Sequence, residues 1–299
     1  MSFLSRREFA VVGAGGVLVV PGAIAQTPTV TASGVVDRIR ANIGVDWKAD
    51  TVDTFKVGDP STAVKGIVVT TMATMDVLKK AVAAGANFVI TSEPTFYSKA
   101  DNPNPPPGRG QAANAPPDAV LTAKKDFIQK NGLVVWRFSD HWRLRTPDPL
   151  AAGISNSMAW DKYRATGDAT HFELPSTTLA ALAANLKLKL GVRGGMRVVG
   201  DPKTEIKKVA LLTGTTALAA SVKTLPGVDA IVAGEVREWE SVEYAQDAVT
   251  AGLKRGMILL GRVVSEEPGM KLCADWLHTI VHEAPVTFIG TGDPYWRPA

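Results

Sequence analysis

Carboxylates and one histidine stand directly after several apolar runs of this chain. Runs rich in Val and Ile are typical of buried strands in a parallel sheet, and the carboxyl ends of such strands converge on a crevice. Carboxylate oxygens and imidazole nitrogens are common ligands of divalent metal ions. This chemistry suits a divalent metal ion among the residues that follow the predicted strands, which include Glu93, Asp140, His141, Glu235, Glu238, Glu266 and Glu267.

The same kind of acid could instead cap a helix, because carboxylates are favoured in the first helical turn. This structural role is preferred for Glu235 and Glu238, which introduce a long helical pattern. For Glu93 and Glu266, each in a short segment that contains a proline, structural and functional roles are equally supported. The other histidines are expected to be solvated or packed side chains: His171, His278 and His282.

Short apolar runs alternate with longer helical patterns, which is typical of α/β architecture with mostly parallel sheets and flanking helices. Strands are predicted at Gly66–Thr71, Asn87–Thr91, Leu133–Phe138, Arg197–Gly200, Val209–Thr213, Asp229–Ala233, Met257–Gly261 and Val286–Ile289. Helices are predicted near Met75–Ala84, Asp118–Asn131, Thr177–Leu190, Thr216–Leu225, Glu238–Gly252 and Gly269–Glu283.

Both halves of the chain show this rhythm, so two related α/β lobes are expected, at residues 26–160 and 161–299. Residues 102–117 contain six prolines and predict a surface excursion without a regular element. Residues 155–175 lack a strong pattern and are expected to connect the two lobes.

Residues 1–25 have the layout of a signal peptide. Arg6 and Arg7 precede an apolar run, and Ala23-Ile24-Ala25 forms a small-residue processing site. The run is shorter than the about 20 residues that a membrane span needs. The leader resembles a twin-arginine export signal. We therefore expect cleavage before Gln26, a periplasmic or secreted location, and contact with the membrane only during export.

The composition and charge of the chain bear on its partners and on its possible disulfides. The chain has 299 residues and a formal net charge of +4, with its charges scattered along the sequence. A nucleic-acid partner is not expected, because such proteins normally carry a basic stripe. Cys273 is the only cysteine, so an intramolecular disulfide is excluded. Its helical spacing with Met270 and Leu277 predicts a packed thiol.

Several segments spread over most of the chain form a recognisable combination: Val89–Tyr97, Arg137–Trp142, Val199–Asp201, Ile206–Ala210, Ala233–Glu235, Gly261–Gly269 and Gly292–Trp296. In this order they resemble the Nif-three-like family of dinuclear metal-centre, hexamer-forming proteins, also described as GTP cyclohydrolase type 2-like. The resemblance implies a Nif-three-like fold and a homo-oligomer, a hexamer. The implied GTP chemistry transfers poorly, because the sequence has no phosphate-cradling loop.

Three histidines that the resemblance implies are replaced here by Ser92, Ser139 and Arg262. Serine is a poor ligand for zinc, and a guanidinium is a permanent cation that cannot coordinate a metal and repels it. Whether Asp140 or His141 matches the central ligand stays open. The candidate metal ligands that remain from the resemblance are Glu93, Asp140, His141 and Glu266, and this set favours one divalent ion over two.

Three functions fit these residues. The first, which is favoured, is a metal-dependent hydrolase of unknown substrate, in which at least one divalent ion activates water. The second is a metal-free enzyme in which Arg262 binds an anionic small-molecule substrate and His141 or Glu93 is the general base. The third is a catalytically silent, oligomeric binding or scaffold protein.

Overall fold

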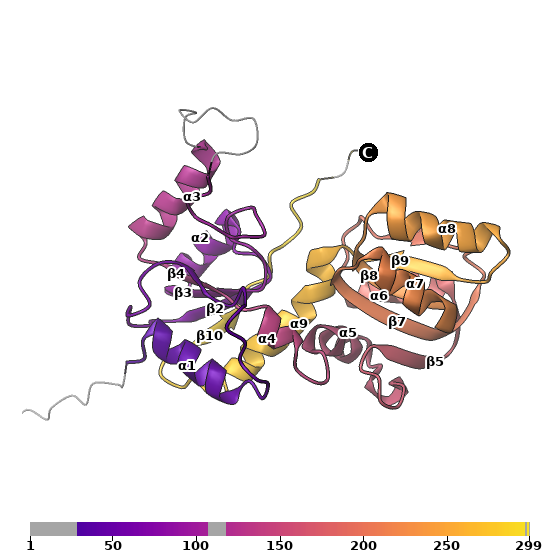
Figure 1. Ribbon diagram of the computed structural model, residues 1–299, viewed down its shortest axis with the longest axis horizontal. Helices are drawn as coiled ribbons and strands as arrows, with labels where there is room; N and C mark the ends of the chain where they lie inside the picture. The colour runs from indigo at the N-terminus through magenta and orange to yellow at the C-terminus, as the bar shows by residue number, and fades with distance from the viewer. Residues whose placement is uncertain (1–28, 107–117, 297, 299) are drawn as a thin grey trace, which may run out of the picture.

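The computed structural model describes residues 29–106, 118–296 and 298, so the predicted leader lies outside the described residues. Two five-stranded sheets, each flanked by helices, form two lobes that stand side by side (Figure 1). The α/β class and the two lobes are as the alternating pattern predicts. Among the described residues, no helix has the length and apolarity needed to span a membrane.

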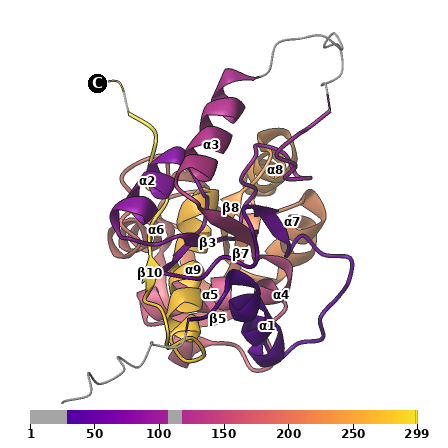
Figure 2. The same ribbon diagram turned by 90° about the vertical axis from the view of Figure 1, so that its left-hand side faces the viewer.

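The first sheet combines four parallel strands with one antiparallel edge strand. Its order is β1 (Phe55–Val57), β4 (Val134–Arg137), β3 (Phe88–Thr91), β2 (Ile67–Thr70) and β10 (Val286–Phe288), with β1 antiparallel to β4. Helix α1 (Ala32–Asn42) covers one face, and α2 (Met75–Ala83) and α3 (Ala119–Lys130) cover the other (Figure 2). The three central strands, β2, β3 and β4, are buried on both faces, which explains their mostly apolar sequences.

The second sheet has a parallel centre and two antiparallel edges. Its order is β5 (His171–Thr178), β7 (Glu205–Thr215), β8 (Ala230–Glu235), β9 (Gly256–Leu259) and β6 (Arg197–Val199). Helices α5 (Pro149–Met158) and α6 (Leu179–Lys189) pack on one face. The other face packs against α8 (Glu243–Thr250), and α7 (Leu218–Thr224) leads into this layer. Three shorter helices complete the described part: α4 (Asp140–Arg143), η1 (Asp161–Tyr163) and η2 (Leu225–Gly227), with a π-helical turn at Glu238–Val242.

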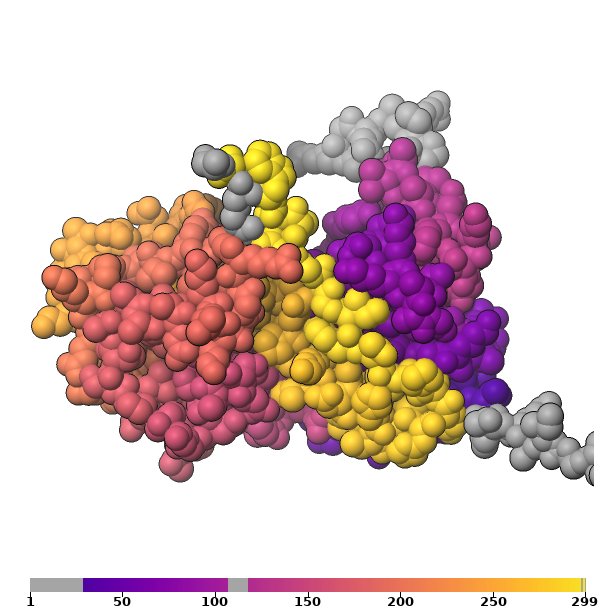
Figure 3. Space-filling model, turned by 180° about the vertical axis from the view of Figure 1, so that it is seen from behind, coloured from indigo at the N-terminus to yellow at the C-terminus, as the bar shows by residue number. Residues whose placement is uncertain are grey.

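Helix α9 (Arg262–Leu277) joins the two lobes. It packs against β2 and β10 of the first sheet and against β7 and β8 of the second. Figure 3 shows the C-terminal part of the chain, in yellow, running between the lobes. Helix α9 crosses α5 at very short range, since a Cβ at Gly153 of α5 would lie 2.3 Å from the backbone nitrogen of Gly269 in α9. Only glycine at this position allows the two helix backbones to approach so closely.

The chain returns to its first sheet at the end. Strand β10 pairs in parallel with β2, so Val286 lies opposite Ile67. The division of the chain into residues 26–160 and 161–299 stays a prediction about domains. The pairing adds that the first sheet takes four strands from residues 55–137 and its edge strand β10 from residues 286–288.

The structure differs from the predicted elements where local pattern is weak or a proline intervenes. The helix predicted at Gly269–Glu283 begins at Arg262 and ends at Leu277, with Pro268 inside it. Proline removes one backbone donor, and this helix continues through that gap. Residues 155–175, expected to be a connector, include the end of α5 and the start of β5. Strands β1 and β5 and helices α1, α4 and α5 have no counterpart among the predicted elements.

Candidate functional site

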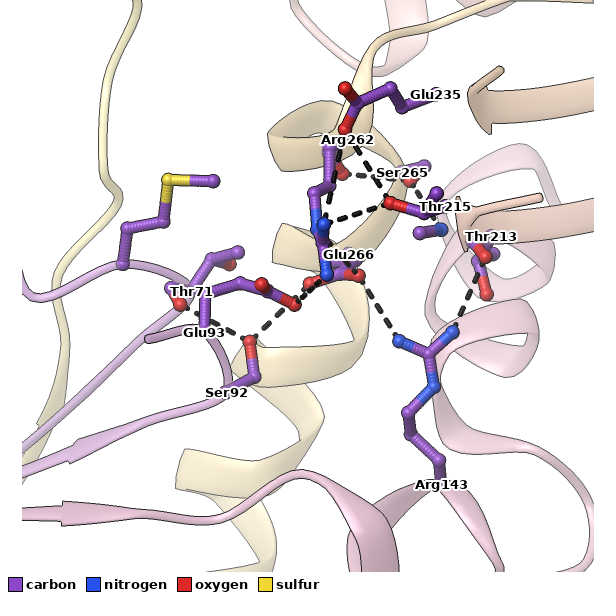
Figure 4. A network of polar contacts seen from close by, with 12 residues as sticks. Thr71, Ser92, Glu93, Arg143, Thr213, Thr215, Glu235, Arg262, Ser265 and Glu266 are labelled. Atoms are coloured by element: carbon purple, nitrogen blue, oxygen red, sulfur yellow. Dashed lines mark hydrogen bonds and ion pairs between the residues drawn. The ribbon is translucent and has the colours of Figure 1, made fainter. Parts of the chain in front are cut away.

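Charged side chains from both lobes meet at the carboxyl ends of the central strands (Figure 4). Glu93 follows β3, Arg143 ends α4, Arg262 begins α9, and Glu266 lies one turn further along the same helix. We call these four residues the charge network. This is the edge at which loops of parallel strands converge, as the sequence pattern predicts.

Arg262 lies at the centre of the charge network. Its Nη2 donates to Glu93 Oε1 at 2.6 Å, and its Nη1 donates to Thr215 Oγ1 at 2.8 Å. Its Nε is buried without a hydrogen-bond partner and lies 3.7 Å from Glu266 Oε1. Glu235 Oε2 is 3.9 Å from Nη1. One guanidinium therefore links the end of β3 to the ends of β7 and β8.

Glu266 is completely buried between the two arginines. Arg143 Nη1 donates to Glu266 Oε1 at 3.1 Å, and Ser92 Oγ donates to Glu266 Oε2 at 3.4 Å. Burial, and then the neighbouring charge of Glu93, raise the pKa of Glu266 to about 7, while Arg143 and Arg262 act in the opposite direction. Two carboxylates in one enclosed site repel each other, so this carboxyl group holds its proton more strongly than an exposed one.

Close backbone packing holds the second sheet against the charge network. Gly214, at φ +70°, leaves room for side chains that a Cβ would meet: Glu266 Oε1 at 2.5 Å and Arg143 Nη1 at 2.9 Å. The Gly214 N–H donates to Ser265 Oγ at 3.0 Å, and that hydroxyl donates to the Arg262 carbonyl at 2.7 Å. These contacts fix the first turn of α9, and with it Arg262, against β7.

His141 does not lie in the charge network. Its ring is buried, 3.7 Å from the parallel ring of Trp47. Its Nε2 accepts from the Lys48 N–H at 2.9 Å, which places the ring proton on Nδ1, 2.7 Å from Asp53 Oδ2. Both ring nitrogens are thus occupied by hydrogen bonds away from the charge network.

Asp140 also faces away from the charge network. Its Oδ2 accepts from Thr51 Oγ1 at 2.9 Å and from the Val52 N–H at 3.0 Å. The buried Asp53 carboxylate meanwhile accepts the backbone N–H groups of Ser139, Asp140 and His141. The start of α4 is therefore a capped helix end. Of the residues predicted to share a site, the structure brings together Glu93, Arg262 and Glu266.

Two contributors to this site were not predicted. Arg143 follows Trp142 in a segment without a clear pattern, and Thr215 lies beyond Thr213, where the strand was expected to end. A signal for Thr215 was present in the polar residues that follow the apolar run of β7, the same feature that identified Glu93. No comparable signal marks Arg143, because only the packing of α4 beside α9 brings it to Glu266.

The residues present do not fit a dinuclear metal centre. Within the described ranges, no group of three or more His, Cys, Asp and Glu side chains is arranged to hold a metal ion. Glu93 and Glu266 are instead each approached by a guanidinium, which cannot donate an electron pair to a metal. A cation placed between these carboxylates would have to displace Arg262.

Sequence comparison decides the family. The Duf34/NIF3 (NGG1p interacting factor 3) family matches residues 132–294, which is more than half of the chain. The chain belongs to the Duf34/NIF3 family. The match covers α4, β7, β8 and α9, so it includes three residues of the charge network. No curated protein matches the chain.

Solved structures share the fold of this chain. A hypothetical protein of Staphylococcus aureus aligns with a TM-score of 0.65 at 16% identity, covering 90% of this chain and 99% of the other. A Bacillus cereus protein related to NIF3 aligns at 0.66 and 13% identity, with coverages of 90% and 99%. A Thermus thermophilus protein aligns at 0.64 and 15% identity, with coverages of 89% and 100%. At these identities, the likeness shows a NIF3-like fold.

Proposed function

We propose that this protein is an exported, metal-independent member of the Duf34/NIF3 family that acts as a binding or scaffold protein. The observation that carries this proposal is the Arg262 guanidinium, 2.6 Å from Glu93 and 3.7 Å from Glu266. It supplies positive charge where a bound cation would otherwise balance two carboxylates. The third function inferred from the sequence is therefore favoured over the metal-dependent hydrolase.

Metal content tests this proposal directly. Protein purified without chelator and equilibrated with Zn²⁺ or Mn²⁺ is expected to retain far less than one ion per chain. Its Tm should not change when EDTA is added, because no ion contributes to folding. Arg262→Ala is the matched variant, and it should bind more metal than the wild type because Glu93 and Glu266 lose their shared cation. Stoichiometric metal in the wild type, with a Tm that falls in EDTA, would contradict the proposal.

A metal-free enzyme is the second candidate, and Arg262 is the observation that favours it. The Arg262 side chain is 31% exposed, so part of it faces solvent and could meet an anionic substrate. His141 is unavailable as its base, which leaves Glu93, itself held by Arg262. A screen with ester, amide and phosphoester substrates is expected to show no turnover. Turnover that Glu93→Gln and Arg262→Ala both abolish would establish this second function.

Export is the part of the proposal that rests on the leader. Arg6 and Arg7 stand before the apolar run, and a processing site precedes Gln26. The mature protein is expected in the periplasm, with the molecular mass of a chain that begins at Gln26. Replacing both arginines by lysine should hold the full-length precursor inside the cell. Unchanged cleavage of the leader in that variant would contradict the assignment of a twin-arginine signal.

We also propose a homo-oligomer, a hexamer, on the resemblance alone. Light scattering of the mature protein tests this. A mass six times that of one chain is expected at micromolar concentrations. A single-chain mass over the same range would show that the scaffold acts as a monomer.

A further inference from the structure

A hollow in the second lobe lies outside the charge network. Its volume is about 340 Å³, and it is lined by the end of α5, by η1, by β5 and by α6. This is near the lower limit of the volumes at which small ligands bind in proteins. No residue of the charge network contributes to it.

The floor of this hollow is apolar. Met158, Trp160, Leu174 and Leu182 line it, and each is at most 9% exposed because the same side chains belong to the core of the second lobe. The Tyr163 ring forms part of the wall. A rigid surface of two aromatic and three aliphatic or thioether side chains suits a flat, apolar group.

Polar groups stand at the rim above this floor. Lys162, Thr177 and Asn185 line the hollow, and Lys162 is the only charged residue among its described lining residues. The Lys162 ammonium lies 4.9 Å from the centre of the Tyr163 ring, so a cation is held beside the aromatic wall. The hollow thus combines one positive charge, hydrogen-bonding groups and an aromatic face.

The backbone is irregular on two sides of the hollow. The pairing of β5 with β7 shifts register between Glu173 and Thr177, around Pro175. At the end of α5, Ala159 adopts φ +55°, a conformation that a residue with a Cβ rarely adopts. Bulges and positive-φ residues of this kind gather beside binding sites, where they aim side chains. Here they set the positions of Trp160 and of the residues at the rim.

We propose that this hollow binds a small aromatic carboxylate. The ring lies on Trp160 and Leu182, and the carboxylate meets the Lys162 ammonium, with Asn185 at hydrogen-bonding reach on the rim. The charge of Lys162 selects an anion, and the narrow apolar floor selects a flat ring over a sugar or a peptide. The proposal is independent of the metal-free assignment of the charge network.

Calorimetric titration of the full mature protein with phenylacetate tests the proposal. Phenylacetamide is the neutral probe of nearly the same shape. Saturable binding of phenylacetate is expected, with phenylacetamide about two- to fivefold weaker, because Lys162 is exposed and a solvent-exposed ion pair contributes no more than that. Lys162→Met should weaken phenylacetate by about the same factor and leave phenylacetamide unchanged. Ala181→Trp, which fills the hollow from exposed α6, should abolish binding of both probes.

Lys187→Met is the control, because it removes a lysine of α6 that does not line the hollow. It should bind phenylacetate as the wild type does, and unchanged Tm values should show that every variant is folded. No saturable binding of either probe would overturn the proposal. Binding that neither Lys162→Met nor Ala181→Trp changes would also overturn it. Equal binding of both probes in the wild type would refute the carboxylate assignment.

Discussion

Glu266 shows how burial and neighbouring charges set the protonation of one carboxyl group. It has no exposed surface, lies between two arginines, and shares its surroundings with the carboxylate of Glu93. Enclosure favours the neutral acid, whereas the guanidinium groups favour the anion. The balance leaves this carboxyl group titrating close to neutral pH.

The stability of the protein should therefore depend on Glu266 between pH 4.5 and 7. Its pKa in the folded protein is raised to about 7 from the ordinary 4.5, so the folded state binds a proton more tightly than the unfolded state in this window. The free energy of unfolding consequently falls as the pH rises through the window, by on the order of 1 kcal/mol for each pH unit. Urea unfolding at several pH values measures this. Glu266→Gln should remove the decline, whereas Glu173→Gln, at an exposed carboxylate, should retain it. Parallel curves for the wild type and Glu266→Gln would contradict the assignment.

Cys273 is a second residue whose chemistry follows from burial. Its thiol is fully buried in α9, and burial raises its pKa far above the usual range. The thiolate is the reactive form, so native protein should not react with iodoacetamide. Mass spectrometry should show one added group per chain only after denaturation in guanidinium chloride. Rapid labelling of the native protein would mean that α9 opens locally.

At the scale of elements, the contact between β7 and α9 depends on a single glycine. Gly214→Ala should lower the free energy of unfolding by about 2–3 kcal/mol. The added Cβ would collide with the side chains of Glu266 and Arg143, and alanine would also be strained at the positive φ of this position. Gly252→Ala is the matched control, since Gly252 has φ +85° with nothing within 4 Å of a Cβ. It should cost about 1 kcal/mol from backbone strain alone. Equal losses in urea unfolding would show that the contact at Gly214 adds nothing.

The elements also show what the sequence can predict. All eight predicted strands are present. The central ones are easy to recognise, because buried parallel strands are apolar along their whole length. The edge strands β1 and β5 were missed; both are partly exposed, and β5 contains Pro175. The start of α9 was missed because the predicted helix began only at Gly269, after Pro268.

The candidate site was predicted in part, for a similar reason. Strand ends correctly located Glu93, and the positions of Arg262 and Glu266 beside it follow from the convergence of loops at one sheet edge. His141 follows a strand in the same way, yet its side chain turns to Asp53. The direction of a side chain on the short helix α4 depends on tertiary packing, which strand spacing does not encode.

At the scale of the whole molecule, α9 and the charge network connect the lobes. Helix α9 packs on both sheets, and Arg143 and Arg262 each bridge to groups on β7. The lobes should therefore unfold together, with far-UV circular dichroism and tryptophan fluorescence changing at the same urea concentration. Arg143→Ala combined with Arg262→Ala should lower the unfolding free energy by about 1–3 kcal/mol.

Lys207→Ala combined with Arg237→Ala serves as the control, because both are exposed arms of surface ion pairs. It should change the unfolding free energy by less than about 1 kcal/mol. Two separate transitions in the wild type would show that α9 does not couple the lobes.

The pairing of β10 with β2 also sets an order of events on the ribosome. Residues 67–70 leave the exit tunnel long before residues 286–288, so the first sheet lacks one edge strand until β10 has been made. The first lobe is therefore completed only after the whole second sheet has been synthesised. A nonsense mutation between the two sheets' last strands, before residue 286, would consequently damage the lobe that was made first.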